Sequence, residues 1–161
     1  FKRPELLPEL AKMLPQYNFT MIGGPVPGCE RMYESIISAA DMIDNLNYLG
    51  AVPYHEVNAY FDRSKIFVNT SDSEGFPNSF LQAWIRGVPV ISFFDPDGLI
   101  ASERLGVVPK NLTDMASQIT DVLGDAVLLD SLSEKSEQYA LDHYSPEVVA
   151  NVYHEAIFGQ K

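Results

Sequence analysis

Short apolar runs alternate with longer segments of helical spacing along most of the chain. The short runs predict strands at residues 18–22, 47–50, 66–69 and 88–92. Segments with apolar residues every three or four positions predict helices at residues 4–14, 30–42, 55–63, 78–86, 113–123, 128–141 and 146–157. Residues 92–104 are expected to be rich in loops, with a type I turn at 95–98. Strands that alternate with helices indicate an α/β fold, a Rossmann-like doubly wound parallel sheet flanked by helices.

One strand of that fold is missing from the pattern. The chain opens on a polar loop and a helix, and no strand is predicted before residue 18. In the strand order 3-2-1-4-5-6 the first strand is central, so strands 18–22 and 66–69 would flank an open position about 10 Å wide. Such an opening would leave backbone groups unpaired in the core. We therefore expect residues that precede Phe1 in a longer protein to supply this strand.

Composition narrows the class of protein and of partner. A length of 161 residues with 46% hydrophobic residues fits one globular domain, taken as residues 1–161. A net charge of −11 argues against nucleic acid as a general partner and against an anionic membrane surface. The single cysteine, Cys29, excludes an internal disulfide and fits a reducing compartment. No apolar run approaches the ~18 residues of a membrane span.

The segment that follows the strand 66–69 is the candidate ligand site. It places Glu74 in a loop of small residues that opens the helix 78–86, and Gln82 follows eight positions after Glu74. Parallel α/β sheets bind ligands at the carboxyl ends of their strands, where helix amino termini point free N–H groups. The loop therefore offers an anion cradle, a fixed carboxylate and a side-chain amide to one small ligand. Asn69, Thr70 and Ser71, at the end of the same strand, would either bind phosphate or cap the strand.

Five short segments lie in order along the chain: KRPE (residues 2–5), MIGGP (21–25), YLGAVP (48–53), SEGFP (73–77) and GVPVI (87–91). Together with Tyr144-Ser145-Pro146 near the end, their order and spacing resemble the carboxy-terminal half of family 4 (group 1) glycosyltransferases. These are retaining nucleotide-sugar enzymes of GT-B architecture, and the resemblance covers nearly the whole chain. It implies that this half binds a nucleoside diphosphate sugar, whereas an amino-terminal half, absent from the sequence, binds the acceptor.

The resemblance also assigns roles to individual residues. Glu74 would hydrogen-bond the hydroxyls of the transferred sugar, Gln82 would contact the nucleotide ribose, and Lys2 would neutralise the departing diphosphate. Fixed donors and one cation would stabilise the negative charge as it builds on that group. The remaining donor-site residues would act through backbone groups or as walls: Gly75, Phe76, Asn78 and Ser79 at the diphosphate, Gly23 and Gly24 beside the ligand, and Val52 and Pro53 beside the base.

Two departures from the family pattern affect the donor site. The family usually has Glu where this chain has Gln82, which keeps the length and a carbonyl acceptor. It loses the charge-assisted part of the hydrogen bond, which is roughly twice as strong as a neutral one. The Arg that usually precedes the Lys would lie ahead of Phe1, and Arg3 is the alternative to Lys2. No metal-ligand spacing occurs in the sequence, so no metal and no cofactor other than the donor is expected.

We therefore expect the donor-binding domain of a retaining glycosyltransferase that acts in cell-surface polysaccharide, lipopolysaccharide or glycolipid assembly. The isolated chain would be inactive, because the catalytic cleft forms between two halves. The full-length protein would be cytoplasmic, at the cytoplasmic face of the membrane if the other half binds there. Two alternatives stay open: a nucleotide-sugar 2-epimerase of the same architecture, and a non-catalytic binding or scaffold module.

Overall fold

The strands form two parallel ladders. The computed structural model describes residues 1–159. Strand β1 (Phe19–Met21) pairs with β2 (Leu46–Tyr48), with Phe19 opposite Leu46. Strand β4 (Val90–Ser92) lies between β3 (Phe67–Asn69) and β5 (Gly106–Val107), and Val90 is the partner of both Phe67 and Gly106. The four predicted strands and their parallel arrangement are confirmed.

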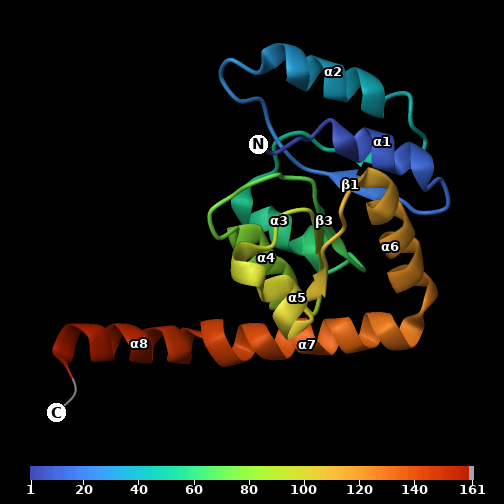
Figure 1. Cartoon of the computed structure of the whole chain (residues 1–161). Coiled ribbons are helices and arrows are strands. Elements are labelled where there is room, and N and C mark those ends of the chain that lie inside the picture. The colour runs from blue at the N-terminus through green and yellow to red at the C-terminus, as the bar shows by residue number, and fades with distance from the viewer. Residues whose placement is uncertain (160–161) are drawn as a thin grey trace.

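No ladder joins β1 to β3 in the described residues, and this is the place where the sequence analysis expects a further strand. The two ladders are nevertheless held together by apolar side chains. Phe19 of β1 and Val68 of β3 pack against one cluster that includes Leu10 and Met115, both fully buried. The fold is therefore an α/β fold in which helices and strands alternate along the chain (Figure 1).

Helices surround the strands. Their bounds are α1 (Leu6–Met13), α2 (Glu30–Ala40), α3 (Tyr54–Phe61), α4 (Asn78–Trp84), α5 (Leu99–Glu103), α6 (Leu112–Gly124), α7 (Ala126–Tyr144) and α8 (Pro146–Phe158). Helix α7 crosses beneath the body of the domain and packs on α4 and α6, and α8 continues beyond it in nearly the same direction (Figure 1). The apolar side chains of Val152, Ile157 and Phe158 on α8 are exposed.

An aromatic cluster fixes α4 against the strands and α7. Phe80 and Trp84 of α4 are fully buried, with ring centroids 5.5 Å apart. Trp84 also donates a hydrogen bond from Nε1 to the Leu105 carbonyl at 3.1 Å, which satisfies its one polar atom. Tyr139 of α7 packs edge-on against Trp84, and burial, followed by Tyr144 and Glu103, raises its pKa to about 12. Helix α4 is therefore held in place by its inner face.

Residues 92–104 are more regular than predicted. They contain a 3₁₀ turn (η1, Pro96–Gly98) and helix α5, and β5 follows. The Asp95 carboxylate accepts hydrogen bonds from the N–H groups of Ile100 at 2.7 Å and Ala101 at 3.3 Å, which organises this polar stretch. The prediction of a type I turn at residues 95–98 was wrong, because Asp97 has a left-handed φ of 54°. Helix α7 starts earlier than predicted, because Asp125 caps its first turn.

Strand β5 has no pattern that sequence periodicity could reveal, since it is two residues long. Its position depends on Gly106, which has a φ of 154° and lies directly against the backbone of β4. A Cβ atom at Gly106 would come within 1.7 Å of the Val90 carbonyl oxygen. Only glycine lets the two strands approach this closely.

Replacing Gly106 by Ala should therefore destabilise the fold by about 3–5 kcal/mol, because the backbones of β4 and β5 must separate. Urea unfolding measures the change. Gly124→Ala is the matched control: its Cβ would meet no atom within 4 Å at the end of α6, so we expect no loss and a gain of up to about 1 kcal/mol. Equal stability of the Gly106→Ala variant and the wild type would contradict this packing.

Candidate functional site

The loop between β3 and α4 holds Glu74 through polar groups of the strand end. Asn69, the last residue of β3, donates from Nδ2 to Glu74 Oε1 at 3.0 Å, and the Ser71 hydroxyl donates to the same oxygen. The side-chain oxygen Oδ1 of Asn69 in turn accepts from the Ser71 N–H at 2.7 Å. The Glu74 side chain is only 10% exposed. Asn69 and Ser71 therefore position the carboxylate.

The first residues of the chain lie across this loop and bring Lys2 to Glu74. Lys2 donates from Nζ to Glu74 Oε2. The backbone around it is fixed by Thr70, whose hydroxyl donates to the carbonyls of Lys2 at 3.1 Å and Arg3 at 2.9 Å. The structure thus joins the two candidate catalytic residues, Lys2 and Glu74, in one ion pair. Arg3 pairs with Asp72 instead, at 3.1 Å.

Glu74 is ionised at neutral pH. Burial raises its pKa, but hydrogen bonds from Lys2, Ser71 and Asn69 lower it by more, so the pKa lies below its usual range. The Glu74 carboxylate is therefore a fixed acceptor for hydrogen bonds. Lys2 is 70% exposed, so its ammonium group stays accessible to an anion above the loop.

The residues that follow Glu74 lead into α4. A Cβ at Gly75 would meet no atom within 4 Å, so the chain is open to a ligand here. The Phe76 ring packs against Trp84 and Tyr144, with centroids 6.2 Å and 5.9 Å away. Asn78 and Ser79 begin a helix with no side-chain cap, and the N–H groups of a first turn have no acceptor within the helix.

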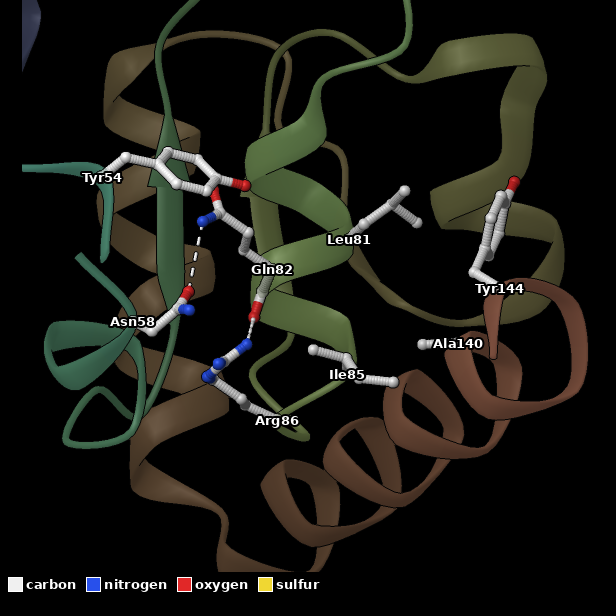
Figure 2. A pocket seen from close by; sticks show the side chains of 8 residues that line it. All are labelled: Tyr54, Asn58, Leu81, Gln82, Ile85, Arg86, Ala140 and Tyr144. Carbon is white, nitrogen blue, oxygen red and sulfur yellow. Dashed lines mark hydrogen bonds between the residues drawn. The ribbon is translucent and has the colours of Figure 1, made fainter. Parts of the chain in front are cut away.

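Gln82 lies in a cavity between α3, α4 and α7 (Figure 2). The cavity has a volume of about 240 Å³. Its polar lining consists of Tyr54, Asn58, Gln82 and Arg86. Its apolar lining consists of Leu81, Ile85, Ala140 and Tyr144. Gln82 Nε2 donates to Asn58 Oδ1 at 3.2 Å (Figure 2). Because Gln82 lies four residues after Asn78, both are on the same face of α4, one turn apart.

The loops after β1 and β2 lie against each other. The Gly23 N–H donates to the Gly50 carbonyl at 2.9 Å, and a Cβ at Gly24 would come within 3.0 Å of the Ala51 Cβ. A side chain at position 24 would thus crowd the neighbouring loop, which is a structural reason for the glycine. Val52 and Pro53 continue this loop, and Pro53 directly precedes α3 and Tyr54.

The candidate site residues therefore form three groups, two of them at the loops that follow β1, β2 and β3 and one between helices. Lys2 and Glu74 form one group, the glycine loop with Val52 and Pro53 a second, and the Gln82 cavity a third. No hydrogen bond among the described residues joins Glu74 to Gln82, and α4 links their groups. Sequence reasoning missed Asn58, whose only signal was its place on the helix that follows Pro53.

A family model for "Glycosyl transferases group 1" matches residues 2–140. The chain belongs to the group 1 glycosyltransferase family. Among curated relatives, an O-antigen biosynthesis glycosyltransferase of Escherichia coli, WbnH, is 35% identical over 92 residues, which are 56% of this chain and 24% of the relative.

Solved glycosyltransferase structures share the fold. Anabaena HepE in complex with UDP-glucose superposes with a TM-score of 0.83 at 15% identity, covering 99% of this chain and 46% of that one. The carboxy-terminal domain of the group 1 glycosyltransferase LpcC of Francisella tularensis gives a TM-score of 0.74 at 18% identity, covering 89% of this chain and 79% of that one. The fold is thus that of the carboxy-terminal domain of a GT-B glycosyltransferase, as the sequence motifs predicted.

This group 1 glycosyltransferase chain spans well under two thirds of the curated relatives it matches, 40% and 24% of two of them. Among residues 1–159, no helix combines the length and the apolar character needed to cross a membrane.

The Lys2–Glu74 contact predicts a measurable change in proton binding. Replacing Lys2 by Met should raise the pKa of Glu74, because burial continues to raise it while a hydrogen bond that lowers it has gone. A carboxyl whose pKa is lowered in the folded state stabilises the fold at pH values above its ordinary pKa. This contribution is lost as the pH falls through the folded-state pKa. The Lys2→Met variant should therefore lose stability at a higher pH on acidification. NMR titration of the Glu74 carboxyl carbon measures the pKa.

Lys12→Met is the control for this titration, because Lys12 lies exposed in the last turn of α1. It removes the same charge and should leave the Glu74 pKa unchanged. A pKa of Glu74 that stays the same in the Lys2→Met variant would show that Lys2 does not hold this carboxylate.

Proposed function

We propose that this chain is the donor-binding half of a retaining glycosyltransferase, which transfers a sugar from a nucleoside diphosphate to an acceptor hydroxyl. The observation that carries the proposal is the ionised Glu74, held by Lys2, Asn69 and Ser71 in the loop between β3 and α4. A fixed carboxylate at the carboxyl end of a strand suits the hydroxyls of a sugar. Membership of a glycosyltransferase family supports the assignment of that sugar to an activated donor.

In the proposed reaction, Glu74 accepts hydrogen bonds from the transferred sugar and orients its anomeric carbon. The bond between this carbon and the diphosphate oxygen breaks, and a bond to the acceptor oxygen forms. The acceptor proton passes to the departing phosphate. Negative charge grows on the diphosphate, and the Lys2 ammonium with the N–H groups at the start of α4 would stabilise it.

Retention of configuration is proposed to come from attack on the same face as the leaving group. Retaining glycosidases instead use two carboxylates about 5–5.5 Å apart. The hydrogen-bond partners of Glu74 are an ammonium, an amide and a hydroxyl, and Asp72 in the same loop is paired with Arg3. This setting favours a carboxylate that binds sugar over one that attacks it.

We further propose a nucleoside diphosphate sugar as donor and an acceptor held by an amino-terminal half outside this chain. The neighbour bound to UDP-glucose supports a nucleotide-sugar donor, and the O-antigen relative supports a role in cell-surface polysaccharide or lipopolysaccharide assembly. The proposed place of action is the cytoplasmic face of the membrane, where the other half would make any peripheral contact.

Turnover of the full-length protein tests the proposal. Glu74→Ala should lower kcat at least about 100-fold, because the transition state loses a preorganised contact. Gln82→Glu should be tolerated, since the carboxylate keeps the acceptor oxygen and strengthens its hydrogen bond. Product formation from radiolabelled nucleotide sugars measures both.

Glu134→Ala on the exposed surface of α7 is the control and should keep full turnover. The neutral Gln82 is the best argument for the alternative, a non-catalytic scaffold protein. In that case the wild type would show no sugar transfer. Wild-type transfer that survives Glu74→Ala would contradict the role of this carboxylate, and an inverted product would contradict the retaining mechanism.

A further inference from the structure

The Gln82 amide is held from one side and open on the other. Gln82 donates from Nε2 to Asn58 Oδ1 at 3.2 Å, across the groove between α3 and α4. Its Oε1 makes no hydrogen bond among the described residues. Among those residues no buried side-chain oxygen or nitrogen lacks a partner, so this oxygen is accessible. The amide therefore offers one acceptor, Oε1, at the cavity that Gln82 lines.

A second link, one helical turn along, fixes the same groove. Arg86 donates from Nε to Asp62 Oδ1 at 2.8 Å and from Nη1 to the Gln82 carbonyl at 3.0 Å. Asn58 and Asp62 lie four residues apart on one chain segment, and Gln82 and Arg86 lie four apart on the other. Residues four apart share a helix face. The two links thus set the position of α4 relative to α3. Figure 2 shows the link from Gln82 to Asn58 and the contact of Arg86 with the Gln82 carbonyl.

The chemistry of the two links differs in a way that matters for a ligand. The link between Arg86 and Asp62 is an ion pair, so Arg86 is already neutralised. The link between Gln82 and Asn58 joins two neutral amides. A primary amide has two N–H groups, so with one bonded to Asn58 the Gln82 amide still presents its second N–H and its carbonyl oxygen, and that oxygen accepts from a ligand that brings a hydroxyl or another donor.

We propose that Asn58 is a positioning residue that holds the Gln82 amide with Oε1 as a hydroxyl acceptor, and so makes the site prefer a ribonucleotide over its 2′-deoxy form. This inference rests on the proposed function, in which Gln82 contacts the ribose of the donor. Without Asn58, the Gln82 amide is free to rotate and loses the fixed acceptor. A site that hydrogen-bonds a ligand hydroxyl discriminates against the analogue that lacks it.

The test compares paired affinities in the full-length protein. Calorimetry first ranks UDP, GDP and ADP, and the tightest binder is then compared with its 2′-deoxy form. A neutral hydrogen bond predicts that the wild type prefers the ribonucleotide about three- to tenfold. Asn58→Ala should reduce this preference to about twofold or less. Asn58→Asp, which keeps the acceptor for Gln82 Nε2, should retain it.

Two further variants separate positioning from a structural effect. Gln118→Ala removes a side-chain amide from α6, outside the groove, and should keep the full preference. Gln82→Leu removes the acceptor and should abolish the preference even if Asn58→Ala fails to fold. An unchanged preference in Asn58→Ala or Gln82→Leu would overturn this inference alone, whereas no binding of any of the three nucleotides by the folded wild type would overturn the proposed function with it.

Discussion

The site depends on keeping a poorly exposed carboxylate charged. Glu74 is 10% exposed, and burial of this kind works against ionisation. Three donors offset it: Asn69 at the strand end and Ser71 in the loop, both close to Glu74 in the sequence, and Lys2 at the start of the chain. The hydrogen bonds from Thr70 to the backbone around Lys2 connect this arrangement to the end of β3. The end of β3 thus sets the geometry of the loop between β3 and α4 that carries Glu74.

Helix α4 carries that geometry to the second part of the site. Phe80 and Trp84 hold its inner face, and Gln82 contacts α3 on its outer face. Just beyond the ends of the two helices, Arg86 pairs with Asp62. A ligand that reached from Glu74 to Gln82 would therefore follow one rigid element. A neutral amide at position 82 gives up the stronger hydrogen bond of a carboxylate but adds no negative charge to the proposed donor site of a chain of net charge −11.

The sequence predicted the fold class, four of the five strands and the loop that carries Glu74, because these follow from local periodicity and from the motifs. Strand β5 was missed because two residues carry no period, and its place is set by the contact of Gly106 with Val90. The Asn58–Gln82 pair was missed for a different reason. It joins residues 24 positions apart on two helices, and only their packing brings them together. The Lys2–Glu74 contact spans 72 positions and was not predicted; the family resemblance gave each residue a role in the donor site but no contact between them.

The central claim is that Glu74 binds the transferred sugar and not the nucleotide. Isothermal titration of the full-length protein and its Glu74→Ala variant, each with a nucleoside diphosphate and with the corresponding sugar nucleotide, tests it most directly. The account predicts that the variant binds the nucleotide sugar about tenfold or more weakly, as expected for a lost charge-assisted hydrogen bond, and the bare nucleoside diphosphate with little change. Equal losses for both ligands, or no loss for either, would contradict it.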